Sequence, residues 1–178
     1  MSILSGPEIK QLLEDGELMR GWDLDHINAS SLDVRLGEEF LLEKVVDPDF
    51  NFVTLDKGCL TPQMTKHEGG INLRPGKFCL AHTKEEFNLP DNISAEFRLK
   101  SSVARKGIDH ALAVWIDAGF HGSVLTLEIR NNLANHTTVL KAGDKIGQIV
   151  FHRHENAGEY SYRNKGSYNN SKSVTQAN

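Results

Sequence analysis

The stretch GSVLTLEIRN, residues 122–131, repeats its side-chain character at every second residue, which is the period of a β-strand. One face would carry Ser123, Leu125, Leu127 and Ile129, and the other Val124, Thr126, Glu128 and Arg130. Further short apolar or alternating segments occupy residues 31–36, 39–46, 78–83, 93–99, 111–116 and 145–152. Many short strands with little helix predict a mainly β fold, either a sandwich or a barrel.

Helix and turn signals surround these strands. At the N-terminus, Ser5 and Glu8 form a capping box, Pro7 suits a first helical turn, and Gly16 would end the helix. We therefore expect one short N-terminal helix. Turns that suit links between strands are RPGK at 74–77, LPDN at 89–92 and KAGD at 141–144.

The composition is that of an ordinary globular chain. Its 178 residues suit a single domain spanning 1–178, and 39% hydrophobic with 25% charged residues excludes a disordered or fibrous class. A net charge of −4 provides no broad basic surface, so we do not expect nucleic acid as a partner. No apolar stretch approaches the roughly 20 residues of a membrane helix, and no signal peptide is recognisable, so we expect no membrane partner and a cytoplasmic location.

Cysteines and histidines form no recognisable metal motif. Cys59 and Cys79 stand in no Cys-x-x-Cys or Cys/His spacing, so we expect reduced thiols rather than a disulfide or a zinc site. His152 and His154 would share one face of a strand, but no third ligand follows at a suitable spacing. We therefore expect no metal held by protein side chains.

The C-terminal residues 159–178 are rich in Ser, Asn and Lys and have almost no aliphatic side chains. Such a segment cannot build a core of its own. It is either a disordered end, which the composition alone favours, or a flap that orders over a ligand or a neighbouring chain.

A short cationic and hydroxyl-rich cluster lies in KSSVARKG, residues 100–107. Lys100, Ser101, Ser102 and Arg105 fall within about one and a half helical turns, and Gly107 would end a short helix there. Two hydroxyls and two cations beside helix amides suit a phosphate group. The alternative is an N-capped surface turn with solvated charges.

Two carboxylates follow this cluster. Glu128 lies in mid-strand, either on a wet face beside Arg130 or in a pocket, where partial desolvation would suit it to general acid and base work. Asp117 follows the apolar run ALAVWI at a strand end. It would either form an Asx turn or accept a hydrogen bond from a sugar hydroxyl. Periodicity alone leaves both pairs of alternatives open.

Taken together, the motifs resemble the dCTP deaminase branch of the trimeric dUTPase superfamily. The resemblance covers nearly the whole chain, and its motifs keep the order and spacing of that branch. The matching segments are ILSGPEIKQLLEDGEL at the N-terminus, INASSLDVRLG at 27–37, KSSVARKGI at 100–108, WIDAGFHG at 115–122, LTLEIRN at 125–131 and LKAGDKIGQIVF at 140–151. The resemblance implies a distorted β-barrel or jelly roll that forms a homotrimer, with active sites at the subunit interfaces.

The resemblance also implies roles for single residues. Glu128 would activate water for attack at cytosine C4, with assistance from Ser101 and Arg105, and Asp117 would read the deoxyribose. Further substrate-binding positions would be Lys100, Ser102, Trp115, Thr126, Leu127, Gln148, Tyr162, Lys165 and Tyr168. The signature of zinc deaminases is missing, so no zinc is expected, and Mg²⁺ would enter only with the nucleotide phosphates.

The first expectation for the reaction is hydrolysis of dCTP to dUTP and ammonia, which would feed dUMP and dTMP synthesis. The alternatives are a bifunctional enzyme that continues to dUMP, a deaminase that accepts dCMP, a pure dUTPase and a non-catalytic nucleotide-binding regulator. Trp115 favours the bifunctional alternative, because members that give dUMP tend to have an aromatic residue there. Ser167 stands where the family has a phosphate-binding lysine, so a distal phosphate would be held weakly, or by Lys165 or Lys172 instead.

Overall fold

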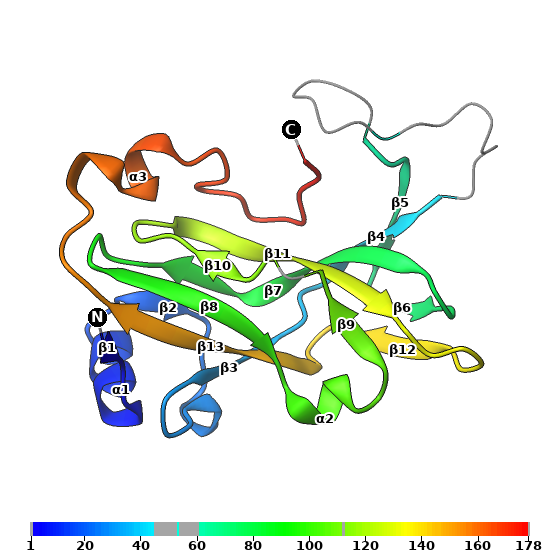
Figure 1. Cartoon of the computed structure of the whole chain (residues 1–178), viewed down its shortest axis with the longest axis horizontal. Helices are drawn as coiled ribbons and strands as arrows, with labels where there is room; N and C mark the ends of the chain where they lie inside the picture. The colour runs from blue at the N-terminus through cyan, green and yellow to red at the C-terminus, as the bar shows by residue number, and fades with distance from the viewer. Residues whose placement is uncertain (1, 45–52, 54–60, 112, 178) are drawn as a thin grey trace.

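The computed structural model describes residues 2–44, 53, 61–111 and 113–177 (Figure 1). Its helices are α1 (Gly6–Glu14), α2 (Ser101–Ala104) and α3 (Tyr162–Lys165), and its 3-10 turns are η1 (Leu24–His26) and η3 (Gly158–Tyr160). The strands are β1 (Ser2–Ile3), β2 (Leu18–Arg20), β3 (Leu32–Arg35), β4 (Glu39–Glu43), β5 (Met64–Glu68), β6 (Gly70–Leu73), β7 (Phe78–Asn88), β8 (Ile93–Leu99), β9 (Ile108–His110), β10 (Trp115–Ile116), β11 (His121–Asn131), β12 (Thr138–Lys141) and β13 (Lys145–Arg153).

Two antiparallel sheets form most of the molecule. In the first, the order is β1-β13-β8-β10, and β3 pairs with the other part of β13. In the second, the order is β5-β4-β7-β11-β9, and β2 pairs with β7. A small ribbon of β12 and β6 lies beside them. The predicted mainly β fold is confirmed, as a two-sheet jelly-roll arrangement whose described strands do not close into a barrel.

One hydrophobic core joins the two sheets. Phe97 and Phe151 come from the first sheet, Phe87 and Leu127 come from the second, and all four are at most 1% exposed. Large aromatic side chains contribute most to the apolar area buried in such a core. The long strands β7, β8, β11 and β13 are therefore the rigid part of the molecule, and the site is built on β11.

The N-terminal helix is confirmed as α1. The Ser5 backbone N–H donates to Glu8 Oε2 over 2.9 Å and its hydroxyl donates to the same oxygen over 2.7 Å. These hydrogen bonds, the backbone one first, lower the pKa of Glu8. Gly16 follows the helix with φ of +82°, a left-handed conformation that suits glycine. None of the helices in the described part of the chain is long and apolar enough to cross a bilayer.

Several strand predictions need correction. The run ALAVWI at 111–116 is a strand only at Trp115–Ile116, and its residue 112 lies outside the described residues. The strand predicted at 39–46 ends at Glu43, and residues 45–46 again lie outside the described part. β5, β6 and β12 were not predicted, because their sequences MTKHE, GINL and TVLK mix polar and apolar residues without a clear period.

Candidate active site

A cavity of about 490 Å³ lies between β11, β10 and the C-terminal tail. That volume is in the range of small-molecule sites. Its wall includes six of the residues predicted to bind or convert substrate: Trp115, Asp117, Thr126, Glu128, Tyr162 and Tyr168. A larger hollow of about 680 Å³ beside β6 and β12 contains none of the predicted residues. We place the candidate site in the smaller cavity, because these predicted residues line it.

The wall formed by β11 departs from simple alternation. Its pairing with β7 shifts register between Val124 and Thr126, and both Val124 and Leu125 line the cavity. Such a bulge changes the direction of the side chains next to it. Beyond it the predicted alternation holds, so Glu128 faces the cavity while Leu127 is fully buried in the core. Any contact between Leu127 and substrate would have to come from its backbone.

Glu128 is partly buried against a histidine that sequence reasoning missed. Its side chain is 27% exposed, and its Oε2 lies 3.2 Å from Nε2 of His110, which is buried on β9. The same Nε2 lies 3.3 Å from the backbone N–H of Glu128. Nε2 therefore faces one acceptor and one donor of a single residue. No spacing signal joins His110 to Glu128 in the sequence, because the pairing of β9 with β11 brings them together.

Asp117 is held by its neighbour Trp115. The indole Nε1–H of Trp115 donates to Asp117 Oδ1 over 3.0 Å, and the indole packs against the ring of His152 with centroids 5.5 Å apart. This contact fixes the direction of the carboxylate at the cavity wall. Tyr162 packs edge-on against Phe120 nearby, and burial raises the pKa of its hydroxyl.

The tail forms another wall of the cavity, which corrects the preference for a disordered end. The Val124 N–H donates to the Ser171 carbonyl over 2.9 Å, and Thr126 and Thr175 are joined through their hydroxyls over 3.0 Å. Lys172 lies 2.5 Å from Glu86 on β7. In Figure 1 the tail runs along β11 toward the C-terminus. It is ordered here because β11 and β7 supply the partners that its own sequence lacks.

The charged residues that line the cavity are carboxylates. Among the described residues that line it, Asp117 and Glu128 are the charged ones, and neither lysine nor arginine is present. The tail cations have other partners: Lys165 lies over the ring of Tyr160, 4.4 Å from its centroid, and Lys172 pairs with Glu86. The cavity thus suits a neutral base and sugar, but it does not supply the cations that phosphates need.

The residues predicted to bind phosphate lie outside this cavity. Ser101, Ser102 and Arg105 are exposed on and just after α2, which Figure 1 places on the side of the sheets away from the tail. Lys100 precedes α2 and donates to Asp33 over 2.6 Å, and none of these four residues lines the cavity. Gln148 on β13 accepts from Ser31 Oγ over 3.3 Å. Within one chain the structure therefore separates the phosphate cluster from the cavity.

Comparison with known proteins gives the family. The family model described as "dCTP deaminase-like" matches residues 3–154. The chain belongs to the dCTP deaminase-like family. A protein of Methanosphaerula palustris named "dCTP deaminase, dUMP-forming" is 38% identical over 156 residues, which cover 84% of this chain and 80% of that protein. A protein of Aquifex aeolicus with the same name is 36% identical over 177 residues, covering 97% and 92%.

A solved structure shares the fold of this dCTP deaminase-like chain. The 2'-deoxycytidine 5'-triphosphate deaminase of Agrobacterium tumefaciens superposes with a TM-score of 0.64 at 24% identity. The superposition covers 84% of this chain and 47% of that longer one. At this identity the likeness shows the fold, and the family assignment rests on the family model and the more similar relatives.

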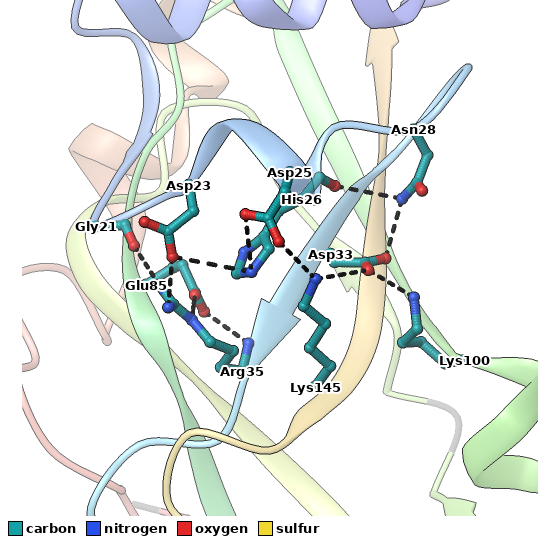
Figure 2. Close-up of polar contacts among 10 residues, drawn as sticks. All are labelled: Gly21, Asp23, Asp25, His26, Asn28, Asp33, Arg35, Glu85, Lys100 and Lys145. Atoms are coloured by element: carbon teal, nitrogen blue, oxygen red, sulfur yellow. Dashed lines mark hydrogen bonds and ion pairs between the residues drawn. The ribbon is translucent and has the colours of Figure 1, made fainter.

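Close to α2, this dCTP deaminase-like chain has a dense polar network on η1, β3, β7 and β13 (Figure 2). Arg35 contacts buried Glu85 through Nε over 2.8 Å and Asp23 over 2.6 Å. Ligand atoms of Asp23, Asp25 and His26 lie within 4.8 Å of one another, a spacing that a metal ion could bridge. Asp23 already pairs with Arg35, and Asp25 with a lysine of β13, so we regard the group as an ion-pair network and assign no metal to it.

The two histidines on and after β13 have different partners. His152 packs against Trp115, whereas His154 hydrogen-bonds to Ser94 over 2.9 Å. Of the two cysteines, Cys79 is a free buried thiol, and Cys59 lies outside the described residues.

Proposed function

We propose that this enzyme deaminates dCTP and then cleaves the phosphate chain, so that its final product is dUMP. Relatives named "dCTP deaminase, dUMP-forming" at 36% to 38% identity support this product over the dUTP expected first from the sequence. The aromatic Trp115 in the cavity wall supports it as well. The observation that carries the proposal is the cavity of nucleoside size in which Glu128 and Asp117 are the charged groups.

In the first step, water attacks C4 of cytosine while Glu128 takes a proton from it. The carboxyl group gives this proton to N3, then takes the proton of the new C4 hydroxyl and gives it to the departing amine, so that dCTP and water give dUTP and ammonia. A single carboxyl group can act in turn as base and acid when its surroundings favour neither state strongly. His110 beside Oε2 would orient the carboxylate during this exchange. In the second step, water attacks the phosphate chain and gives dUMP and pyrophosphate.

The complete site is proposed to form between copies of the chain in a homotrimer. The cavity of one copy supplies the carboxylates and the sugar contact, and α2 of a neighbour supplies Ser101, Ser102 and Arg105. The exposure of these three residues and their separation from the cavity support this arrangement. Arg105 and Ser101 would then stabilise negative charge that develops on the attacked base. Residues 159–178 would act as a flap of the single domain 1–178.

Magnesium would enter with the nucleotide phosphates and neutralise part of their charge. Near α2 the buried carboxylate is Asp33, whose oxygens accept from Asn28 over 2.9 Å and from Lys100 over 2.6 Å. Because these oxygens have partners, the residues fit an ion held chiefly by phosphate oxygens rather than by a side-chain cage.

The reaction is tested by incubating the purified protein with dCTP, dCMP and dUTP, with and without magnesium, and separating the products by chromatography. Ammonia, pyrophosphate and dUMP from dCTP are the expected products. Accumulation of dUTP would show that the enzyme stops after deamination, and turnover of dCMP would show that the triphosphate is not required. Glu128→Gln should still bind dCTP and lose deamination; full activity of this variant would refute the role of Glu128.

The shared site is tested by mixing two inactive variants. Glu128→Gln damages the cavity, and Arg105→Ala damages the α2 cluster. If sites form between copies, refolding the two variants together restores some intact sites, and activity returns to roughly a quarter of that of the unaltered protein. A mixture that stays inactive, while each variant alone still forms trimers, would place both residues in the site of a single copy.

A further inference from the structure

Lys145, the first residue of β13, lies beside the phosphate cluster but is not among the residues assigned to substrate, although Gln148 of the same motif is. Its Nζ is 3.8 Å from Asp33 Oδ2, the same oxygen that accepts from Lys100 Nζ over 2.6 Å. Figure 2 shows both lysine side chains converging on this carboxylate, one from each side. The backbone also joins the two positions, because the Lys100 N–H donates to the Ile146 carbonyl over 3.2 Å.

We propose that Lys145 is a second phosphate-binding cation of the nucleotide site, held next to Lys100 by Asp33. The inference rests on the proposed function and adds a residue to its phosphate site. It identifies the group that takes the more distal part of the triphosphate. The ligand chemistry is that of a polyphosphate chain, and the two ammonium groups bind it as separate point charges.

Asp33 explains why two lysine ammonium groups can lie so close together. Its side chain is 6% exposed, and Asn28 donates to its other oxygen over 2.9 Å, so the carboxylate is fixed in place. With both lysines charged, the three groups carry a net charge of +1, and the carboxylate screens the repulsion between the ammonium groups. The lysine side chains remain 26% and 37% exposed, so a phosphate oxygen can reach them from solvent.

Other features of the chain support such a residue. Lys100 offers no bidentate fork for phosphate oxygens, because its side chain ends in an ammonium group. The two tail lysines pair with Tyr160 and Glu86 in this structure. Gln148, three residues after Lys145 on β13 and paired in register with Asp33, lies on the same part of the molecule. Lys145 therefore extends an existing cluster.

Asp25 allows a second test of the proposal, in which the expected change in affinity has the opposite direction. Its carboxylate lies 3.4 Å from Lys145 Nζ and is 76% exposed, so it competes with an incoming phosphate for the same ammonium group. Lys145 lowers the pKa of Asp25, although partial desolvation, the largest influence, acts the other way. Removing this carboxylate should free Lys145 for the ligand.

The experiment measures calorimetric binding of dCTP, dCMP and inorganic tripolyphosphate to the full chain. Lys145→Ala should weaken the binding of dCTP and of tripolyphosphate by about tenfold, because a charged hydrogen bond to the distal phosphates is lost. The binding of dCMP, which lacks those phosphates, should weaken by less than about twofold. Lys145→Arg should keep the affinity. Asp25→Asn should strengthen the binding of dCTP by about two- to threefold. The double variant that combines Asp25→Asn with Lys145→Ala should bind like Lys145→Ala alone.

Lys106→Ala serves as the matched control, because Lys106 is an exposed lysine just after α2 and outside this network. Circular dichroism and gel filtration confirm that each variant is folded. Unchanged binding by Lys145→Ala, or an equal loss for dCTP and dCMP, would overturn the inference. If the unaltered protein binds tripolyphosphate through Lys145 but does not convert dCTP, the proposed function fails and the phosphate site stands. If it binds neither ligand, both fail.

Discussion

Glu128 and His110 lie in contact beside the cavity, with 3.2 Å between Oε2 and Nε2. Nδ1 of His110 and Oε2 of Glu128 are both buried without a hydrogen-bond partner among the described residues. Two such buried polar atoms are costly, and retaining them beside a cavity points to a role there rather than to packing. The residue is therefore better explained as a positioning residue for Glu128 than as core filling.

Replacing His110 tests this explanation. His110→Phe keeps the ring in the core but removes Nε2, so we expect kcat to fall about tenfold or more with KM unchanged. His110→Gln should recover part of the rate by restoring a polar group. Steady-state kinetics measures both effects, and full activity of His110→Phe would indicate a packing role only.

Cys79 gives a prediction about reactivity. Burial raises the pKa of its thiol to about 12. Only the thiolate reacts with alkylating reagents, and a raised pKa means that it forms only as the pH approaches that value. In a Cys59→Ser background, the native protein should therefore resist iodoacetamide at pH 8, and the protein in denaturant should react. Mass spectrometry reads the labelling, and rapid labelling of the folded chain would contradict the buried position.

At the scale of elements, the tail and β11 act together. Deleting residues 167–178 removes the hydrogen bonds from Ser171 and Thr175 to β11 but keeps α3. We expect KM for dCTP to rise about tenfold, while Tm falls by less than about 4 °C, because the segment's apolar contribution to the packed interior comes from Val174 and Tyr168 and the two sheets stay complete. Kinetics and scanning calorimetry check this. Unchanged kinetics would mean that the tail covers the cavity without serving it.

Helices and strands with a clear hydrophobic period or capping motif could be predicted from the sequence. Strands and segments that are held by pairing with a distant strand could not. α1 has a capping box, and β11 alternates beyond its bulge, so both are visible in the sequence. β5 has no such pattern, because it is a mostly exposed strand held by its pairing with β4. The order in the tail likewise depends on hydrogen bonds to β11. Local sequence cannot report a partner that is far away along the chain.

For the whole molecule, the ion pair between Arg35 and Glu85 links β3 to β7. Glu85 is fully buried, and the Arg35 backbone N–H donates to it as well, over 2.9 Å. Arg35→Met should lower the free energy of unfolding by roughly 3 to 5 kcal/mol, because it leaves a buried carboxylate without its partner. Arg20→Met is the control: Arg20 is 73% exposed and 3.9 Å from Glu86, so less than about 1 kcal/mol is expected.

Urea denaturation of both variants gives the two values. A similar small loss for Arg35→Met and Arg20→Met would show that the buried pair adds little to stability.

For the site, the sequence indicated which residues to examine but not where all of them lie in the structure. The resemblance placed Glu128, Asp117 and Trp115 in one site, and the structure brings them to one cavity. It does not bring Ser101 and Arg105 there, because α2 lies on another side of the subunit. Sequence motifs record which residues act together, but they do not say whether one chain or several supply them. The contact of His110 with Glu128 was not predicted, because strand pairing and not a motif produces it. The carboxylate that Lys100 shares with Lys145, the residue proposed above, likewise leaves no signal in the sequence.

One wall of the cavity is the segment 166–177, which is a strand of neither sheet. Such a segment can move away as a unit, without any change in the sheets behind it. The contacts that hold it include hydrogen bonds along β11 and the pair between Lys172 and Glu86. We therefore expect product release to depend on how often this short segment detaches, so that solvent viscosity and temperature act on turnover through the tail rather than through the chemistry.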